Sequence, residues 1–436
     1  MSGRPASSYA WTDDWPTTSL GEIASIHSGS TPRRNVPGFW GGTIPWVTPG
    51  ELTSLDAKYL TETREQITSS GLASCAASLV PKDALLVTTR ATLGSAALAA
   101  MPITTNQGFR SLVFGSAATP HFFYHLNSRL VPEFTRRASG TTFLEISSKQ
   151  FADVAVPLPT LHEQHRIAEI LDTIDEAIRK TEQVIAKLQQ IKQGLLHDLL
   201  TRGIDENGEL RDPARTPEQF SDSRLGRIPK EWEVTQIAEV AEFITSGSRG
   251  WAAFYSDSGP LFLRIGNLTR EHINLRFASV VHVRPPRGSE GKRTGVEEGD
   301  ILVSITADLG IVGVVPPGFG EAYVNQHVAL VRLDSERAHP RWIGHFLAGR
   351  SSQKQFERLN DQGAKSGLNL PGVGGLLVAL PPQREQSHIA RILDETDERI
   401  AREMRGTDKL RTLKRGLIDD LLTGRIRVPQ LEEVSA

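Results

Sequence analysis

Few residues of this sequence are spaced for covalent chemistry. Its three Pro-Pro pairs stand in RPPR, VPPG and LPPQ, so none forms the Asn/Asp/Ser-Pro-Pro-aromatic tetrad of amino-methyltransferases. No G-x-x-x-x-G-K-[ST] phosphate loop occurs, which excludes the common motif of ATP-driven motors. Glu298 and Asp300 in EEGDILVS lack the acid-x-Lys pair of a nuclease, and a turn before a strand explains them better. We therefore expect no catalytic residue in this chain.

Metal binding has little support either. His121 and His125 lie one helical turn apart, as do His162 and His165, but neither pair has an obvious third ligand. We predict packing or surface roles for these histidines and no metal site. The single cysteine, Cys75, excludes an intramolecular disulfide and a Cys-cluster zinc site, and we predict a small buried residue there.

Basic loops offer a different chemistry, the reading of base edges in a DNA groove, which needs Arg, Lys, Asn, Gln, Ser or Thr side chains. A lone surface arginine is usually only solvated, but here loops at matching places in both halves of the chain are basic. The candidates are Arg33, Arg34, Arg90, Thr141, Thr142 and Lys149 in the first half, and Arg249, Arg264, Arg287, Lys292, Arg293 and Lys365 in the second.

The bulk composition limits the class of protein. A chain of 436 residues with 39% hydrophobic and 23% charged residues predicts two or more globular domains. Because the net charge is only −2, any DNA-binding face must be local. No run of eighteen apolar residues and no secretion signal is apparent, so we expect a cytoplasmic protein without a membrane span.

An internal repeat organises the chain. EQHRIAEILDTIDEAI (163–178) returns as EQSHIARILDETDERI (385–400), identical at ten of sixteen positions and displaced by 222 residues. Upstream echoes keep the same order, such as DALLVTTRATLG with DILVSITADLG, and TTNQGFRSLVF with YVNQHVALVRL. The Asn-Gln pair of the last two segments recurs in modules that would have to read different bases. We therefore predict that Asn106 and Asn325 satisfy backbone groups near a strand start.

The repeat predicts two mixed α/β modules, each followed by a long helix. DALLVTT, FRSLVF, DILVSI and HVALVRL predict strands of an irregular, mostly antiparallel sheet, with helical segments such as HFFYHLNSRLVPEF interspersed. The predicted boundaries are 1–159 for module 1, 160–203 for the first helix, 204–222 for a linker, 223–382 for module 2, 383–426 for the second helix and 427–436 for a tail.

Each long helix carries a coiled-coil seam with alternating spacings of four and three residues. We expect the two seams to pair with each other as an antiparallel coiled coil, which would give the molecule a pseudo-twofold axis; an intermolecular homodimer is the alternative. Both seams include a lysine, Lys192 and Lys414. The apolar seam residues are Ile167, Leu171, Ile174, Ile178, Ile185, Leu188, Leu195 and Leu199 in the first helix, and Ile389, Leu393, Ile400, Leu410, Leu417 and Leu421 in the second.

Off the seam, the polar residues also repeat. A charged helix face is usually only solvated, but repetition suggests one surface presented to two copies of a partner. The predicted partner-docking residues are Glu163, Gln164, Asp172 and Asp175, with Glu385, Gln386, Asp394 and Asp397 as their copies.

VPLPTLHEQHRIAEILDTIDEAI, the terminal LLHDLLTRGI, the linker ending in GRIPKEW and the duplication of the whole unit resemble the DNA-specificity subunit of type I restriction-modification systems. The resemblance covers nearly the whole chain and implies that each module is a target recognition domain for half of a bipartite, asymmetric site in double-stranded DNA. It implies that the helices set the spacing and bind two methyltransferase (modification) subunits, which restriction (translocase) subunits join.

In that family this chain would be non-catalytic and free of cofactors. S-adenosylmethionine, ATP and Mg²⁺ are then expected only in the partner subunits. Two other classes of protein remain open from the residues alone: a stand-alone DNA-modifying enzyme, and a coiled-coil scaffold without DNA binding.

Overall fold

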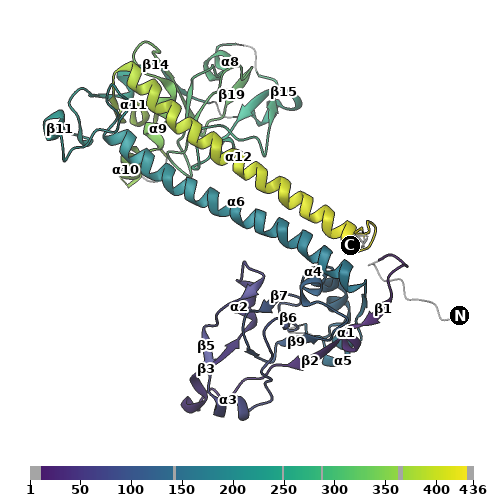
Figure 1. Ribbon diagram of the computed structural model, residues 1–436. Helices are drawn as coiled ribbons and strands as arrows, with labels where there is room; N and C mark the ends of the chain where they lie inside the picture. Colours follow the sequence, from purple (N-terminus) through teal and green to yellow (C-terminus); the bar gives the residue numbers. More distant parts are fainter. Residues whose placement is uncertain (1–10, 141–143, 248–249, 286–287, 362–366, 430–436) are drawn as a thin grey trace, which may run out of the picture. The chain divides into compact units, whose positions relative to one another are not determined.

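The chain divides into two compact units that do not follow the order of the sequence. In the computed structural model, the described residues are 11–140, 144–247, 250–285, 288–361 and 367–429. Unit 1 comprises residues 1–181 and 406–436, and unit 2 comprises residues 182–405 (Figure 1). Each long helix therefore contributes one half to each unit, whereas the sequence had placed the helices between the modules.

Unit 1 is built on three sheets. The largest has the order β2-β9-β6-β7-β4, formed by Ala24–Ser28, Phe109–Phe114, Leu85–Thr88, Ala96–Ala99 and Tyr59–Leu60. A second sheet joins β5 (Glu65–Ile67), β3 (Trp40–Val47) and β8 (Thr104–Thr105), and a third pairs β1 (Thr17–Ser19) with β10 (Ala155–Pro157). The helices are α1 (Leu20–Ile23), η1 (Pro37–Phe39), α2 (Pro49–Thr53), α3 (Ser69–Ala73), α4 (Pro120–Arg137) and α5 (Ser148–Ala152).

Unit 2 repeats this plan. Its main sheet has the order β14-β20-β17-β18, formed by Ala241–Ser246, Val328–Leu333, Ile301–Ser304 and Val312–Val314. The counterparts of the smaller sheets are β16 (His282–Val283), β15 (Tyr255–Leu263) and β19 (Ala322–Val324), and the pair of β13 (Glu233–Gln236) with β21 (Leu377–Leu380). The four strand segments predicted from apolar runs are thus confirmed as β6, β9, β17 and β20.

The helices of unit 2 are mostly short. They are η2 (Pro217–Gln219), α7 (Ile237–Val240), η3 (Trp251–Phe254), η4 (Ile265–Asn267), α8 (Ser289–Thr294), α9 (Pro340–Ala348), α10 (Arg350–Asp361) and α11 (Leu370–Gly374). A hairpin of β11 (Phe220–Ser223) and β12 (Gly226–Pro229) begins inside the predicted linker, so the end of that linker is ordered.

Two long helices, α6 (Leu161–Thr201) and α12 (Gln383–Leu421), complete the repeat (Figure 1). Within unit 1, Asp175 of α6 contacts Lys414 of α12, and within unit 2 Lys192 contacts Asp397. Moving forward along α6 thus means moving backward along α12, so the predicted antiparallel, intrachain pairing is confirmed. Glycine at 406 does not interrupt α12.

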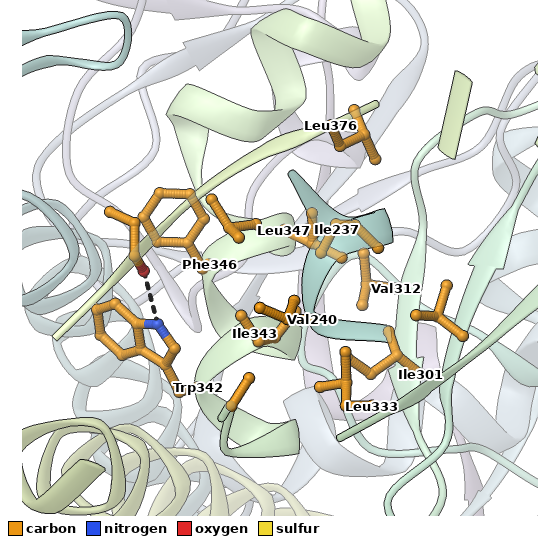
Figure 2. Packing of buried hydrophobic residues seen from close by; sticks show 14 of the residues in the cluster. Ile237, Val240, Ile301, Val312, Leu333, Trp342, Ile343, Phe346, Leu347 and Leu376 are labelled. Atoms are coloured by element: carbon orange, nitrogen blue, oxygen red, sulfur yellow. Dashed lines mark hydrogen bonds between the residues drawn. The ribbon is translucent and has the colours of Figure 1, made fainter. Parts of the chain in front are cut away.

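The core of each unit combines sheet and helix residues. Figure 2 shows part of the core of unit 2, where the Trp342 indole nitrogen donates to the Ala379 carbonyl at 2.9 Å beside Ile343 and Leu347. The ends of the long helices enter these cores: Ile167 and Leu171 in unit 1, and Ile389 and Leu393 in unit 2, are each 0% exposed. Burial of apolar surface therefore fixes each helix end on its own module. No helix of the described chain combines the length and hydropathy of a membrane span.

Candidate nucleic-acid interface and helix anchors

The predicted DNA-contacting residues of unit 1 lie on exposed loops. Arg34, in the loop between β2 and β3, is 53% exposed, and its guanidinium carbon lies 4.0 Å from the Trp40 ring centroid and 4.8 Å from that of Trp46. Its Nη2 atom donates to Glu65 at 3.0 Å. Stacking and the carboxylate together orient the guanidinium, while half of the side chain stays free to reach a ligand. Arg33 beside it is exposed.

The other candidates of unit 1 are less constrained. Arg90 follows β6 in an exposed turn, with its Nε atom 3.6 Å from a Glu145 carboxylate oxygen. Lys149 is exposed on α5. Thr141 and Thr142 lie outside the described residues. The structure thus leaves Arg33, Arg90 and Lys149 accessible without bringing them to a single point.

Three of the six candidates of unit 2 fall within the described residues. Lys292 is exposed on α8, and Arg293 next to it donates to the Ser246 carbonyl at 2.8 Å. Arg264 is half-buried, with its Nη2 atom 3.4 Å from the Ser279 hydroxyl. These contacts tie two of the three guanidinium or ammonium groups to neighbouring loops. Arg249, Arg287 and Lys365 lie outside the described residues.

The duplicated asparagines have the structural role that was predicted. Asn106 Oδ1 accepts from the Gly108 amide at 2.8 Å, and Asn325 Oδ1 accepts from the His327 amide at 3.1 Å. Both form the turn that leads into a central strand, so the same residue type serves the same backbone in each unit.

The duplicated glutamines anchor each long helix to its own module. Gln164 Oε1 accepts from the Thr119 amide at 2.8 Å, and its Nε2 donates to the carbonyls of Ala117 and Pro159 at 3.0 and 2.9 Å. Gln386 repeats the pattern with the His339 amide at 2.8 Å and the Pro381 carbonyl at 2.9 Å. Thr119 and His339 are the N-cap residues of α4 and α9, so each amide joins the starts of two helices.

The glutamates before them bind arginines that follow the opposite helix. Glu163 Oε1 accepts from Arg427 at 2.7 Å, and Arg427 lies just beyond α12. Glu385 Oε1 accepts from Arg211 at 2.6 Å and from the Ile204 amide at 2.9 Å, and both donors lie just beyond α6. Side chains of Glu163 and Glu385 are only 3% and 8% exposed. Each helix start is thus closed by the segment that leaves the other helix within the same unit.

The next duplicated acid is held by a helical pair of the module. Asp172 accepts from Lys58 at 2.6 Å and from His125 at 2.8 Å, with His121 3.7 Å away. Asp394 accepts from Arg341 at 2.6 Å and from His345 at 2.7 Å. The packing role predicted for His121 and His125 is confirmed, because both meet Asp172. Within the described residues, no group of three or more His, Cys, Asp or Glu side chains could hold a metal ion.

Electrostatics favour the charged form of these acids and the neutral form of the histidines. Burial alone would raise the pKa of Asp172, but hydrogen bonds from His121, His125 and Lys58 outweigh it and hold that pKa below its usual range. Burial likewise opposes, and His345 and Arg341 reverse, a shift that leaves the pKa of Asp394 lowered. Desolvation lowers the pKa of His125 and His345 despite the neighbouring carboxylates.

The last duplicated acid meets the seam lysine of the other helix. Lys192 Nζ lies 2.5 Å from Asp397, and their side chains are 8% and 3% exposed. Lys414 Nζ lies 2.5 Å from Asp175, and these side chains are 30% and 33% exposed. The two ion pairs are repeat counterparts in the two units, and only the pair in unit 2 is buried.

The prediction of an outward, partner-docking face is therefore wrong in its geometry. Five of its eight residues are buried, and all eight are engaged by partners of this chain; the buried five are Glu163, Gln164, Glu385, Gln386 and Asp397. Asp172, Asp175 and Asp394 keep some exposure but spend their carboxylates on intrachain cations. These side chains attach the helices to the modules and to each other.

The sequence gave no warning of the basic partners, although a signal was present. His121 and His125 stand at the same repeat position as Arg341 and His345, 220 residues apart. A donor pair and an acceptor that recur with nearly equal displacement indicate an intrachain contact. The seam residues themselves divide into well-buried ends and half-buried middles, such as Ile174, Ile178, Ile185 and Leu410.

Replacing Gln386 by alanine is expected to destabilise unit 2 by about 2–4 kcal/mol, because the His339 amide and the Pro381 carbonyl lose a buried partner. Chemical unfolding followed by tryptophan fluorescence measures the change. The matched control is Gln189→Ala on the exposed face of α6, where little change is expected. Equal costs at the two positions would contradict the anchoring role.

The stability of unit 1 is expected to fall as the pH drops below about 6.5, the ordinary pKa of histidine. The pKa of His125 is lowered in the folded chain, so between that pKa and 6.5 only the unfolded chain binds the proton. Below pH 3.8 the lowered pKa of Asp172 adds a further loss of stability, because the unfolded carboxylate protonates first. Urea unfolding at several pH values should give a shallower pH dependence in His125→Gln; an unchanged slope would contradict this assignment.

Comparison with known proteins agrees with this architecture. A family model described as the type I restriction modification DNA specificity domain matches residues 12–190 and again residues 229–410. These two matches cover most of the chain, one in each repeat. The chain belongs to the type I restriction-modification DNA specificity family.

Individual relatives carry the same family description. The type I restriction enzyme MjaIX specificity subunit of Methanocaldococcus jannaschii is 28% identical over 261 residues, which is 59% of each chain. The MjaVIII specificity subunit of the same organism is 26% identical over 318 residues, or 71% of each chain. The chain thus matches 59% and 71% of the length of these relatives.

A solved structure has the same fold. The crystal structure of a type I restriction-modification system S subunit from M. genitalium superposes with a TM-score of 0.59 at 13% identity, covering 98% of this chain and 99% of that chain. The likeness extends through both units and both long helices.

Proposed function

We propose that this chain is the sequence-specific DNA-binding specificity subunit of a type I restriction-modification complex. Each module reads one half of a bipartite, asymmetric target, and α6 and α12 set the spacing and dock two modification subunits. The observation that carries the proposal is the tandem family match, one DNA specificity domain in each of two modules that present different basic loops.

The different loops of the two modules explain why the target would be asymmetric. The Arg34 loop of unit 1 is supported by Trp40 and Trp46, whereas in unit 2 the exposed cation Lys292 lies on the short helix α8. If both modules enter one face of B-DNA, the half-site centres lie about 34–36 Å apart, one helical turn. Bases between them would be sensed only through backbone and shape.

Catalysis then belongs to the partners. The modification subunits bind S-adenosylmethionine and methylate the DNA, and the restriction subunits use ATP and Mg²⁺, while this chain supplies position and sequence choice. The known relatives are specificity subunits, which favours a non-catalytic chain.

Co-expression with a candidate modification subunit tests the proposal. The expected result is a stable assembly of two modification subunits with one copy of this chain, and methylation confined to one bipartite sequence. Methylation by this chain alone would indicate a stand-alone modifying enzyme. Failure to bind any DNA in the presence of the partner would favour a scaffold.

A further inference from the structure

One exposed stripe recurs on both long helices and is not used by any contact described above. Its residues follow the spacing i, i+4, i+7, which places them on one helix face. Ile191 and Leu413 are 46% and 52% exposed, large values for residues of this size. The stripe consists of Lys187, Ile191 and Gly194 on α6 in unit 2, and Lys409, Leu413 and Gly416 on α12 in unit 1, all exposed and each 222 residues from its copy.

The glycines of the stripe have no reason inside the described chain. Glycine is a poor helix former, so its place in a helix interior needs a compensating role. A Cβ atom added at Gly194 or at Gly416 would meet nothing within 4 Å, so neither position is crowded by another segment. The same unfavourable residue at two equivalent, open positions indicates that something outside the chain approaches the backbone there.

The apolar residue and the glycine of α12 border an open groove. Its volume is about 610 Å³, and Leu413, Gly416 and Leu417 line it together with polar neighbours. Leu417 belongs to the seam and packs against the core of unit 1. The groove therefore continues an apolar surface that is already buried, and its floor is open because glycine has no side chain.

We propose that each stripe is a dock for one copy of the modification subunit, and that the glycine notch receives an apolar helix of that subunit. This inference rests on the proposed function. Two identical stripes on one chain fit two copies of a partner with a single complementary patch. The lysine at the start of each stripe calls for a carboxylate on the partner beside its apolar residue.

A second copy of this chain fits the stripes less well. Each chain carries two such stripes, so pairing of stripe with stripe would link chain to chain without closing, and would give an open polymer. A different partner that carries one patch caps each stripe once and gives a closed, finite assembly.

Filling the notch tests the proposal. Gly194→Leu or Gly416→Leu blocks one dock, and leucine is a good helix former whose added atoms meet no neighbour at the Cβ position. We expect each single variant to bind one modification subunit at concentrations where the wild type binds two. The affinity of the altered dock should fall about thirtyfold or more, as for a central interface residue, and the double variant should bind none. Native mass spectrometry measures the stoichiometry.

Controls separate docking from folding. Gln189→Leu places the same side chain on α6 away from the stripe and should leave two subunits bound. The double glycine variant should unfold at a temperature no lower than the wild type, because leucine favours the helix.

The outcomes are distinguishable. If the double variant still binds two modification subunits with unchanged affinity while the wild-type complex methylates its site, the docks are overturned and the proposed function stands. A wild-type chain that binds no modification subunit overturns both. Self-association of the isolated chain that disappears in the double variant, with two modification subunits still bound, assigns the stripes to a second copy and overturns this proposal.

Discussion

Replacing Asp397 by alanine is expected to lower the free energy of unfolding of unit 2 by about 3–5 kcal/mol. The substitution leaves Lys192, whose side chain is only 8% exposed, without its counter-charge in the seam. Removing one member of a buried ion pair costs the desolvation of the other, which its remaining contact with the Glu271 carbonyl does not offset. Native-state hydrogen exchange on amides of unit 2 reports this change without assuming that the whole chain unfolds in one step.

The repeat provides the matched control for this substitution. Asp175→Ala removes the same side chain at the equivalent position, but Asp175 and Lys414 are 33% and 30% exposed, so about 1 kcal/mol or less is expected. The double variant Lys192→Met, Asp397→Leu should regain most of the lost stability, since Asp397 Oδ2 has no hydrogen-bond partner within the described residues. Equal losses for Asp397→Ala and Asp175→Ala would show that burial is not the deciding factor.

Exchanging residues 17–157 for the matching segment of another specificity subunit is expected to change one half of the methylated sequence and leave the other half intact. These limits follow the pairing of β1 with β10, which closes the module. They keep Thr12 and Trp15, because the Thr12 amide donates to the Thr423 carbonyl at 2.7 Å and Trp15 is buried beside the tail after α12. Each mismatched base pair costs about 1–3 kcal/mol, so two mismatches reduce methylation at the old site about thirtyfold or more.

Methylome sequencing of cells that carry the exchanged subunit and its partner measures this result. The reciprocal exchange of residues 233–380, bounded by the pairing of β13 with β21, should change only the other half. A change in both halves after a single exchange would mean that the two modules do not read DNA independently.

Much of the scaffold could be predicted because its signals are local. Short apolar runs bounded by turn residues marked β6, β9, β17 and β20, and a 4–3 apolar spacing marked the long helices. The recurrence of Asn106 and Asn325 in modules that must differ in specificity correctly indicated a backbone role. Antiparallel pairing of α6 with α12 followed from having two matching seams in one chain.

The orientation of the charged helix faces could not be predicted in the same way. A row such as Glu163, Asp172 and Asp175 has the pattern of a solvated face when the helix is considered alone. In the structure their partners are Arg427, Lys58 and Lys414, which lie more than a hundred residues away in the sequence. Only the fold brings these groups together, and the burial of one of them, Glu163, depends on the chain that follows α12.

Because unit 1 is assembled from both ends of the chain, its folding is tied to the course of protein synthesis. The 224 residues of unit 2, from 182 to 405, are made between the two parts of unit 1. At about 5–20 residues per second, the first part waits roughly 11–45 s for Leu421, Leu422 and Arg427. Unit 2 is continuous and can complete its core first, although it emerges second. During that interval Ile167 and Leu171 lack part of their cover, which makes the nascent first module a natural client for a chaperone.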